Sequence, residues 1–303
     1  MEKKLLVEDQ IRKNKRDTVL VCTFMALLFI GIILALGIFI FGGNILVALI
    51  FALPIGIGYV LMMYSISVKT VLSAAKARPA NPNIREEKLL IHRVEEMSIA
   101  SGLPMPKVYV QDSEYINAFA TGRNPSEGIV CVTTGALYKL NQEELTGVIA
   151  HEMSHIKNYD IRVATVTIAV VGAISLISEI VFYSMFLGGG SRGGRRDGGG
   201  GIIVIIAFLF AILAPIFANL TYLAISRKRE YLADSTGAYL SRNPEGLAKA
   251  LEKIKQDAPA TKPKGSKTVA PLYISNPFKS QNISSMWSTH PPIDERIRRL
   301  RSM

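Results

Sequence analysis

Two histidines and a glutamate form a five-residue group, His151 to His155, inside the stretch "VIAHEMSHIKNYD" at 148–160. On an α-helix, residues four apart lie on one face, so both imidazoles can point at one ion. Neutral imidazole binds zinc with bonds of about 2.0–2.1 Å. Glu152 is rotated away from the metal itself, where it can take a proton from a zinc-bound water whose pKa zinc lowers to about 7. The group therefore predicts a zinc site that hydrolyses peptide bonds.

A catalytic zinc site takes three protein ligands and leaves one position for water, so a third ligand is needed. The stretch "RKREYLADS" offers Glu230 and Asp234, which are four residues apart and share a helix face. Glu230 is the candidate ligand. Asp234 can accept a hydrogen bond from the second nitrogen of a zinc-bound histidine. Spacing alone leaves open the alternative that Glu230 forms a solvated salt bridge with the neighbouring Lys and Arg residues.

The residues before the histidines predict the helix that must position them. Asn141 can cap that helix, and Glu144 lies at its third position, as in a capping box. We therefore expect a helix over 141–160 that carries the HEMSH group.

A small α+β segment is predicted ahead of this helix. Residues 83–102 form an amphipathic pattern with Asn83 as its N-cap and Gly102 as its stop. Short runs rich in Val, Ile, Thr and aromatic residues predict strands at 107–113, 116–122 and 128–137.

The composition indicates a membrane protein. The chain has 303 residues, is 49% hydrophobic and has a mean hydropathy of +0.28. Residues 18–68 contain no charged side chain, which is long enough for two spanning helices. Two further apolar runs, 164–187 and 202–225, flank a Gly/Arg loop at 188–201, and only Glu179 interrupts the first of them. The sequence thus predicts four transmembrane helices.

The net charge of +11 fits basic cytoplasmic flanks of these spans, and no nucleic-acid-binding motif accompanies it. The two cysteines give no disulfide framework, which fits a reducing compartment. We therefore expect both termini and the protease domain on the cytoplasmic side. The predicted order is a basic tail (1–16), transmembrane helices 1 and 2 (17–68), the first part of the protease domain (69–160), transmembrane helices 3 and 4 (161–225), and the second part of the domain (226–303).

Five motifs, in order along the chain, resemble the HtpX family of integral-membrane zinc endopeptidases, which are relatives of the CAAX prenyl proteases. They are "SGLPMPKVYV", "INAFATG", "HEMSHIKNYD", "SRKREYLAD" and "STHPPIDERI". The resemblance implies a mainly α membrane protein with a small β-sheet and a cytoplasmic gluzincin-like domain. It also implies one zinc ion held by His151, His155 and Glu230, with Glu152 as the general base.

The motif "INAFATG" resembles the family's edge strand beside the active site, where a substrate backbone would pair as an added β-strand. By this resemblance Asn117, Ala118 and Phe119 are candidate substrate-binding residues. Asn117 and His290 resemble residues near the scissile carbonyl and are candidates to stabilise the oxyanion. His290 precedes two prolines, so it can equally be a simple turn residue.

Membership would imply quality control of misfolded or damaged membrane proteins at the cell (inner) membrane, with protein substrates and the lipid bilayer as partners. Three alternatives stay open: an inactive zinc-binding scaffold, a transporter with an incidental HExxH, and a prenyl-protein protease. Glu152 argues against the scaffold, and the absence of charge in the first two apolar runs argues against the transporter.

Overall fold

The computed structural model describes residues 44–167, 227–257, 267–275 and 291–303, together with residue 216 and scattered positions between 9 and 34. The predicted third and fourth spans, the 188–201 loop, Glu179 and His290 lie outside the described residues.

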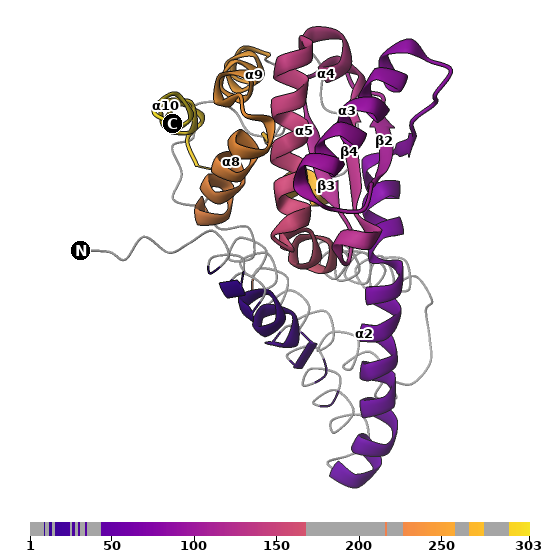
Figure 1. Ribbon diagram of the computed structural model, residues 1–303. Coiled ribbons are helices and arrows are strands. Elements are labelled where there is room, and N and C mark those ends of the chain that lie inside the picture. The colour runs from indigo at the N-terminus through magenta and orange to yellow at the C-terminus, as the bar shows by residue number, and fades with distance from the viewer. Residues whose placement is uncertain are drawn as a thin grey trace, which may run out of the picture.

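The described part is mostly helical with one small mixed sheet, as the sequence predicts (Figure 1). Its elements in chain order are α2 (Ile45–Ala75), β1 (Ala77–Pro79), α3 (Arg85–Ser101), β2 (Lys107–Gln111), β3 (Ala118–Thr121), η1 (Pro125–Glu127), β4 (Ile129–Thr133), α4 (Thr134–Lys139), α5 (Gln142–Lys157), α8 (Arg227–Ser241), α9 (Pro244–Gln256), η3 (Lys267–Leu272) and α10 (Ile293–Arg301).

The four strands lie in the order β1-β2-β4-β3, so β3 is an edge strand. β2 and β4 are parallel, whereas β1 and β3 are antiparallel to their neighbours. The β3–β4 register pairs Ala118 with Val132 and Ala120 with Val130. Successive side chains on a strand point to opposite faces, so the sheet has two distinct surfaces.

One face of the sheet packs into the main core. Ala118, Ala120, Val130 and Val132 contact the buried apolar residues of α3, α5, α9 and α10 there. On the other face, Phe119 and Cys131 pack with the end of α2 and with η3 in a second, smaller core. The aromatic rings of Phe119 and Tyr273 meet edge to face in this smaller core, with centroids 5.4 Å apart.

The sheet and helices α3, α4, α5, α8, α9 and α10 form one packed part of the molecule, called the head below (Figure 1). Helix α5 lies at its centre, between the sheet and the group α8, α9 and α10. Its capping box is formed as predicted: Asn141 accepts from the Glu144 backbone, and the Glu144 carboxylate accepts from the Asn141 backbone. Gly237 of α8 faces α5 so closely that a Cβ there would lie 2.9 Å from the backbone nitrogen of His151. A small residue therefore sets the distance between the two helices that carry the candidate ligands.

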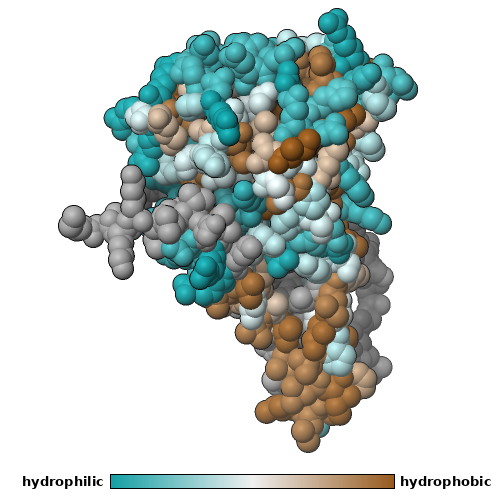
Figure 2. Space-filling view, in the orientation of Figure 1, coloured by the Kyte–Doolittle hydropathy of each residue, from teal (hydrophilic) through white to brown (hydrophobic). Residues whose placement is uncertain are grey.

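Helix α2 extends away from the head, and its outer surface is apolar (Figure 2). Among the described residues, no single helix is by itself long and apolar enough to cross a membrane. The two parts of α2, Ile45–Tyr59 and Tyr64–Ala75, meet at 47° and together reach the length and composition of a span.

Several predicted boundaries are wrong. The strand predicted at 128–137 ends at Thr133, because the Thr133 hydroxyl accepts from the Ala136 backbone and caps α4. Helix α3 has Ile84 as its N-cap, not Asn83. Residues 226–254, which the sequence analysis left undivided, contain two helices, α8 and α9, since Arg242 has a positive φ and Asn243 caps α9.

Candidate zinc-protease active site

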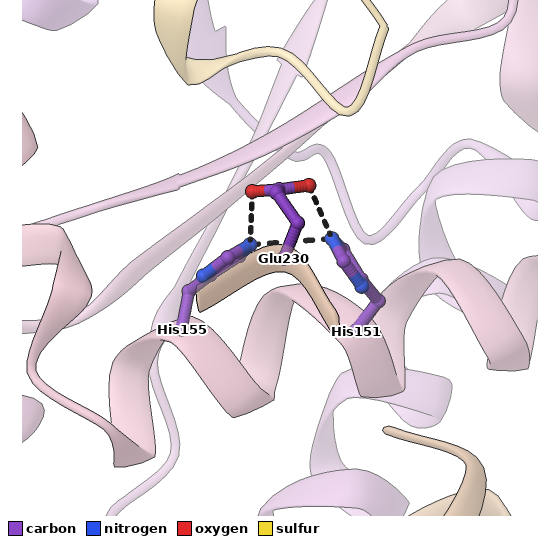
Figure 3. A group of neighbouring side chains, drawn as sticks. All are labelled: His151, His155 and Glu230. Atoms are coloured by element: carbon purple, nitrogen blue, oxygen red, sulfur yellow. Dashed lines mark hydrogen bonds and ion pairs between the residues drawn. The ribbon is translucent and has the colours of Figure 1, made fainter. Parts of the chain in front are cut away.

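Three side chains from two helices converge in the interior of the head. Figure 3 shows the imidazoles of His151 and His155 rising from α5 toward the carboxylate of Glu230 on α8. The two Nε2 atoms are 3.2 Å apart. Glu230 Oε1 lies 3.5 Å from His155 Nε2, and Oε2 lies 3.8 Å from His151 Nε2. A buried histidine, a partly buried histidine and a buried glutamate thus aim their ligand atoms at one point.

These three residues fit a zinc ion. Bonds of about 2.0–2.1 Å in tetrahedral geometry place ligand atoms about 3.3 Å apart, close to the separations found here. The three ligand atoms all lie within 4.8 Å of one another. Two imidazoles and one carboxylate are also the ligand set of a common class of catalytic zinc sites that keep one position for water. Glu230 therefore meets the histidines, as the family resemblance implies.

Glu152 lies beside this cluster and is almost completely buried. The backbone of Ala120 contributes a hydrogen bond to its carboxylate. Burial raises the pKa of Glu152 to about 7, and the positive charge on His155 and this backbone hydrogen bond work against the rise. A buried carboxylate with a pKa near neutrality is suited to accept a proton from a water molecule.

An aspartate lies behind each histidine. Asp234 Oδ1 is 3.0 Å from His151 Nδ1, the position predicted for it. Asp160 Oδ2 is 3.1 Å from His155 Nδ1, and the sequence analysis did not single out this residue. Such carboxylates hold the ring orientation and the tautomer that leaves Nε2 free for a metal. The only sequence signal for Asp160 is its place five residues after His155.

Each aspartate is in turn paired with a buried arginine that sequence reasoning missed. Arg296 of α10 contacts Asp234 through two hydrogen bonds, of 2.8 and 2.7 Å. Arg229 of α8 lies 3.3 Å from Asp160. The spacing of these residues in the sequence does not reveal the pairs, because 62 residues separate Asp234 from Arg296.

The charges around the site act differently on the two histidines. Burial lowers the pKa of His151, which favours the neutral form that binds metal. Burial also disfavours the charged form of His155, but Asp160, Glu230 and Glu152 outweigh it and raise the pKa of His155 to about 9. Without a metal, a proton on His155 compensates the nearby carboxylates. Binding of a metal would displace that proton.

A small pocket opens beside Glu152 and the ligands His155 and Glu230. Its remaining lining residues are Ala120, Asp160, Ile161, Ala164, Arg229, Pro271 and Leu272. The edge strand β3 thus reaches the site through Ala120, and the end of η3 lines it through Pro271 and Leu272.

The predicted substrate-binding residues lie at the other end of β3. The Asn117 amide donates to Ser275 O, at 2.8 Å, and the Ala118 carbonyl accepts from the backbone of Ile274, at 3.0 Å. The Phe119 side chain is buried against Tyr273. The roles of these three residues in binding stay predictions, as does that of His290, which lies outside the described residues.

Comparison with known proteins agrees with this geometry. The family model described as "Peptidase family M48" matches residues 85–303. The chain is 42% identical over 306 residues to a "Protease HtpX homolog" of Streptococcus uberis, covering 98% of this chain and 100% of that protein. A protein of the same name from Streptococcus agalactiae serotype III is 44% identical over 300 residues, with the same coverage.

Among solved structures, the crystal structure of S. mikatae Ste24p is similar, with a TM-score of 0.50 and 22% identity. The match covers 95% of this chain and 66% of that longer chain. At this identity the likeness shows a shared fold. Together with the family match and the close relatives, it leads to one conclusion: the chain belongs to peptidase family M48, as a membrane metalloprotease.

Proposed function

We propose that this protein is a zinc endopeptidase that cleaves misfolded or damaged membrane proteins on the cytoplasmic side of the cell membrane. One observation carries the catalytic part of the proposal: His151, His155 and Glu230 converge within 4.8 Å next to the buried carboxylate of Glu152.

In this proposal His151, His155 and Glu230 hold one zinc ion. When bound, zinc activates water as a nucleophile and polarises the scissile carbonyl. Glu152 accepts a proton at its carboxylate and passes it on to the departing amine. Asp234 and Asp160 hold the two imidazoles with Nε2 directed inward. The burial of Glu152 keeps it a base close to neutral pH.

The edge strand suggests where the substrate backbone binds. In an antiparallel pair, alternate residues direct their N–H and C=O groups toward the neighbouring strand. Thr133 donates to the Asn117 carbonyl, so Asn117 and Phe119 face β4 and Ala118 and Ala120 face outward. Ile274 already pairs with the Ala118 carbonyl, whereas Ala120 lines the pocket. We therefore place the main-chain contact with substrate at Ala120. This residue directly follows the three that the resemblance suggests, Asn117, Ala118 and Phe119.

Recognition through a substrate backbone supports a broad choice of unfolded substrates. Main-chain hydrogen bonds supply affinity without reading side chains, but they require an extended segment. A folded protein does not present such a segment, while a misfolded one does. This property supports quality control as the function.

The surroundings of α2 support a site close to the membrane surface. Large apolar side chains of α2 are exposed, including Leu46 at 73% and Ile50 at 66%. Further along α2, the Arg123 guanidinium lies over the Tyr64 ring, 5.5 Å from its centroid, and Lys76 follows the last turn of the helix. Basic residues at the end of a span favour the cytoplasmic side. The head that carries the zinc site would then lie in the cytoplasm beside the bilayer.

The test is the Glu152→Gln variant, compared with Glu143→Gln on the exposed side of the same helix. Glu152→Gln should keep one zinc ion per chain and lose at least a hundredfold of its cleavage of an unfolded test protein such as casein. Glu143→Gln should keep both properties. Full cleavage by Glu152→Gln would contradict the proposed mechanism.

The same assay separates two of the alternatives, the inactive zinc-binding scaffold and the prenyl-protein protease. A wild-type protein that retains zinc but cleaves neither casein nor a peptide with a prenylated C-terminal cysteine would be an inactive scaffold. Cleavage restricted to the prenylated peptide would identify a prenyl-protein protease and refute the quality-control assignment.

A further inference from the structure

The buried guanidinium of Arg296 is the most unusual charge in the described part of the chain. It lies on α10 with no exposed surface, and it is the largest of the fully buried side chains there. A buried charge is costly unless it is paired and hydrogen-bonded. Its partners therefore indicate why it lies there.

Those partners, apart from one backbone carbonyl, are all at the zinc site. Nε and Nη2 of Arg296 donate to the two oxygens of Asp234, at 2.8 and 2.7 Å. Nη1 lies 3.4 Å from Glu230 Oε2 and donates to the Ile274 carbonyl at 3.2 Å. Nη2 also lies 3.4 Å from His151 Nε2. One side chain thus contacts two of the three ligands and the aspartate behind the first of them.

The contact with Asp234 fixes the plane of its carboxylate. Two parallel N–H···O bonds from a planar guanidinium permit one relative orientation, which a single-point contact does not. In that orientation Asp234 Oδ1 lies 3.0 Å from His151 Nδ1. The carboxylate then accepts from Nδ1–H, and the lone pair of Nε2 points toward the metal position.

We propose that Arg296 is a positioning residue of the zinc site, which fixes Asp234 against His151 and holds Glu230 in place before the metal binds. This role rests on the proposed metal site. It goes beyond it by making α10 a third element on which zinc affinity depends, beside α5 and α8.

The corresponding pair behind His155 provides an internal comparison. Arg229 approaches Asp160 with a single ion pair at 3.3 Å, and both residues retain slight exposure. This contact does not fix the plane of the carboxylate as the two hydrogen bonds from Arg296 do. Loss of Arg229 should therefore affect zinc binding less than loss of Arg296.

Other contacts keep α10 attached when Arg296 is replaced. The Arg299 guanidinium lies 3.8 Å from the centre of the Tyr231 ring on α8. Arg301 pairs with Glu245 of α9 at 3.0 Å, and Ile297 and Leu300 are buried in the main core. A variant at Arg296 thus keeps most of the helix–helix interface, and Arg299→Met is a matched control for loss of an arginine from the same helix.

The experiment measures the zinc dissociation constant by chelator competition in the full-length, detergent-solubilised protein, together with the melting temperature with and without zinc. The variants are Arg296→Met, Arg296→Lys, Asp234→Asn, the double variant Arg296→Met/Asp234→Asn, and Arg299→Met.

We expect Arg296→Met and Asp234→Asn each to weaken zinc binding by about 10–100-fold, as losses of supporting groups do. Arg296→Lys should show a smaller loss, because a lysine keeps the charge without the planar fork. The double variant should bind zinc no more weakly than whichever single variant binds it less tightly. Each single change leaves the charge of the other residue buried without this partner, and the second change removes that charge, so the two losses do not add. Arg299→Met should keep its zinc affinity within about twofold.

A purely structural arginine would give a different result. It would lower the melting temperature equally with and without zinc, and zinc affinity would stay within twofold of wild type; this would overturn the proposal. So would losses that multiply in the double variant. If Arg296→Met does not fold, Arg296→Lys with wild-type affinity would overturn the proposal in the same way. A wild-type protein that binds no zinc would refute the proposed function itself.

Discussion

Glu230 supplies the only carboxylate among the three candidate zinc ligands, and each of its oxygens faces a different histidine. It is buried together with His151 and Glu152. Two carboxylates this close in a dry site repel each other unless a cation lies between them or beside them. A zinc ion would relieve this repulsion. Removal of the charge at position 230 should therefore lower the affinity of the site for zinc.

Glu230→Gln should therefore lower zinc retention by more than the roughly 10–100-fold expected for loss of a supporting group. The measurement is zinc content after dialysis against a weak chelator. Glu245→Gln, on the neighbouring helix α9, should retain wild-type zinc. Equal zinc content in Glu230→Gln and wild type would remove Glu230 from the ligand set.

At the scale of elements, the approach of α8 to α5 decides whether the ligands meet. A Cβ at Gly237 would lie 2.9 Å from the nitrogen and 3.1 Å from the Cα of His151, and both are backbone atoms that cannot turn aside. A methyl group at this position would push α8 and its two carboxylates away from the histidines.

Gly237→Ala should cost about 1–3 kcal/mol in unfolding free energy through overpacking. It should also weaken zinc binding, although residue 237 touches no metal ligand side chain. Thermal unfolding and chelator competition would measure the two effects. Ser235→Ala on the same helix is the control. A Gly237→Ala protein with unchanged zinc affinity would show that zinc binding does not depend on the close approach of α8 to α5.

A second pair of elements is joined by charge. Arg78 of β1 donates to both oxygens of Glu87 on α3, at 3.0 and 2.7 Å, and the Glu87 carboxylate is buried. Its hydrogen bonds with the Arg78 guanidinium lower the pKa of Glu87, and burial opposes them.

Because the folded-state pKa is lowered, the pair stabilises the protein above the unfolded pKa of about 4.5. This contribution is lost as pH falls through the folded pKa. Glu87→Gln should therefore melt below wild type at pH 7, and the difference should shrink below pH 4.5. A difference that stays constant between pH 7 and pH 3 would show that the charge of Glu87 contributes nothing to stability.

The elements that sequence predicts best are those with local signals. The α5 capping box needs residues three apart, and the histidines that it places need residues four apart. Pairings between distant residues carry no such signal. Strand β1 is three residues long and exists because it pairs with β2, and the bond from Ile274 to Ala118 depends on the folded head.

The same distinction applies to the site. Spacing predicts that Glu230 and Asp234 share a helix face, but only the family resemblance brings that face to the histidines. Asp160, Arg229 and Arg296 read in the sequence as ordinary charged residues of a basic chain. Their function follows from burial, which spacing does not reveal: Arg296 reaches His151 across 145 residues of sequence.

At the scale of the whole molecule, a polar head carries the site and an apolar stem extends from it (Figure 2). The exposed apolar residues of α2 lie on the stem, and Arg123 and Tyr64 join its upper part to the loop after β3. An apolar surface of this kind fits lipid rather than water.

Ile50→Lys should weaken this attachment, since a lysine on a lipid-facing surface is unfavourable; its cost is about 2.5–3.5 kcal/mol at the centre of a spanning helix and smaller near the end of α2, where Ile50 lies. We expect a larger fraction of the variant to be extracted from membranes at alkaline pH. Ile50→Leu should remain with the membrane fraction. Equal retention of the lysine and leucine variants would show that this surface of α2 does not face lipid.

The buried arginine on α10 has a consequence for the protein while it is being made. Synthesis proceeds from the N-terminus at roughly 5–20 residues per second, so the 62 residues between Asp234 and Arg296 take about 3–12 s. During that interval the nascent chain already contains all three zinc ligands but not the guanidinium that holds two carboxylates in place. The order of helices along the chain thus delays completion of the site, at a time when the new protease is surrounded by other unfolded chains.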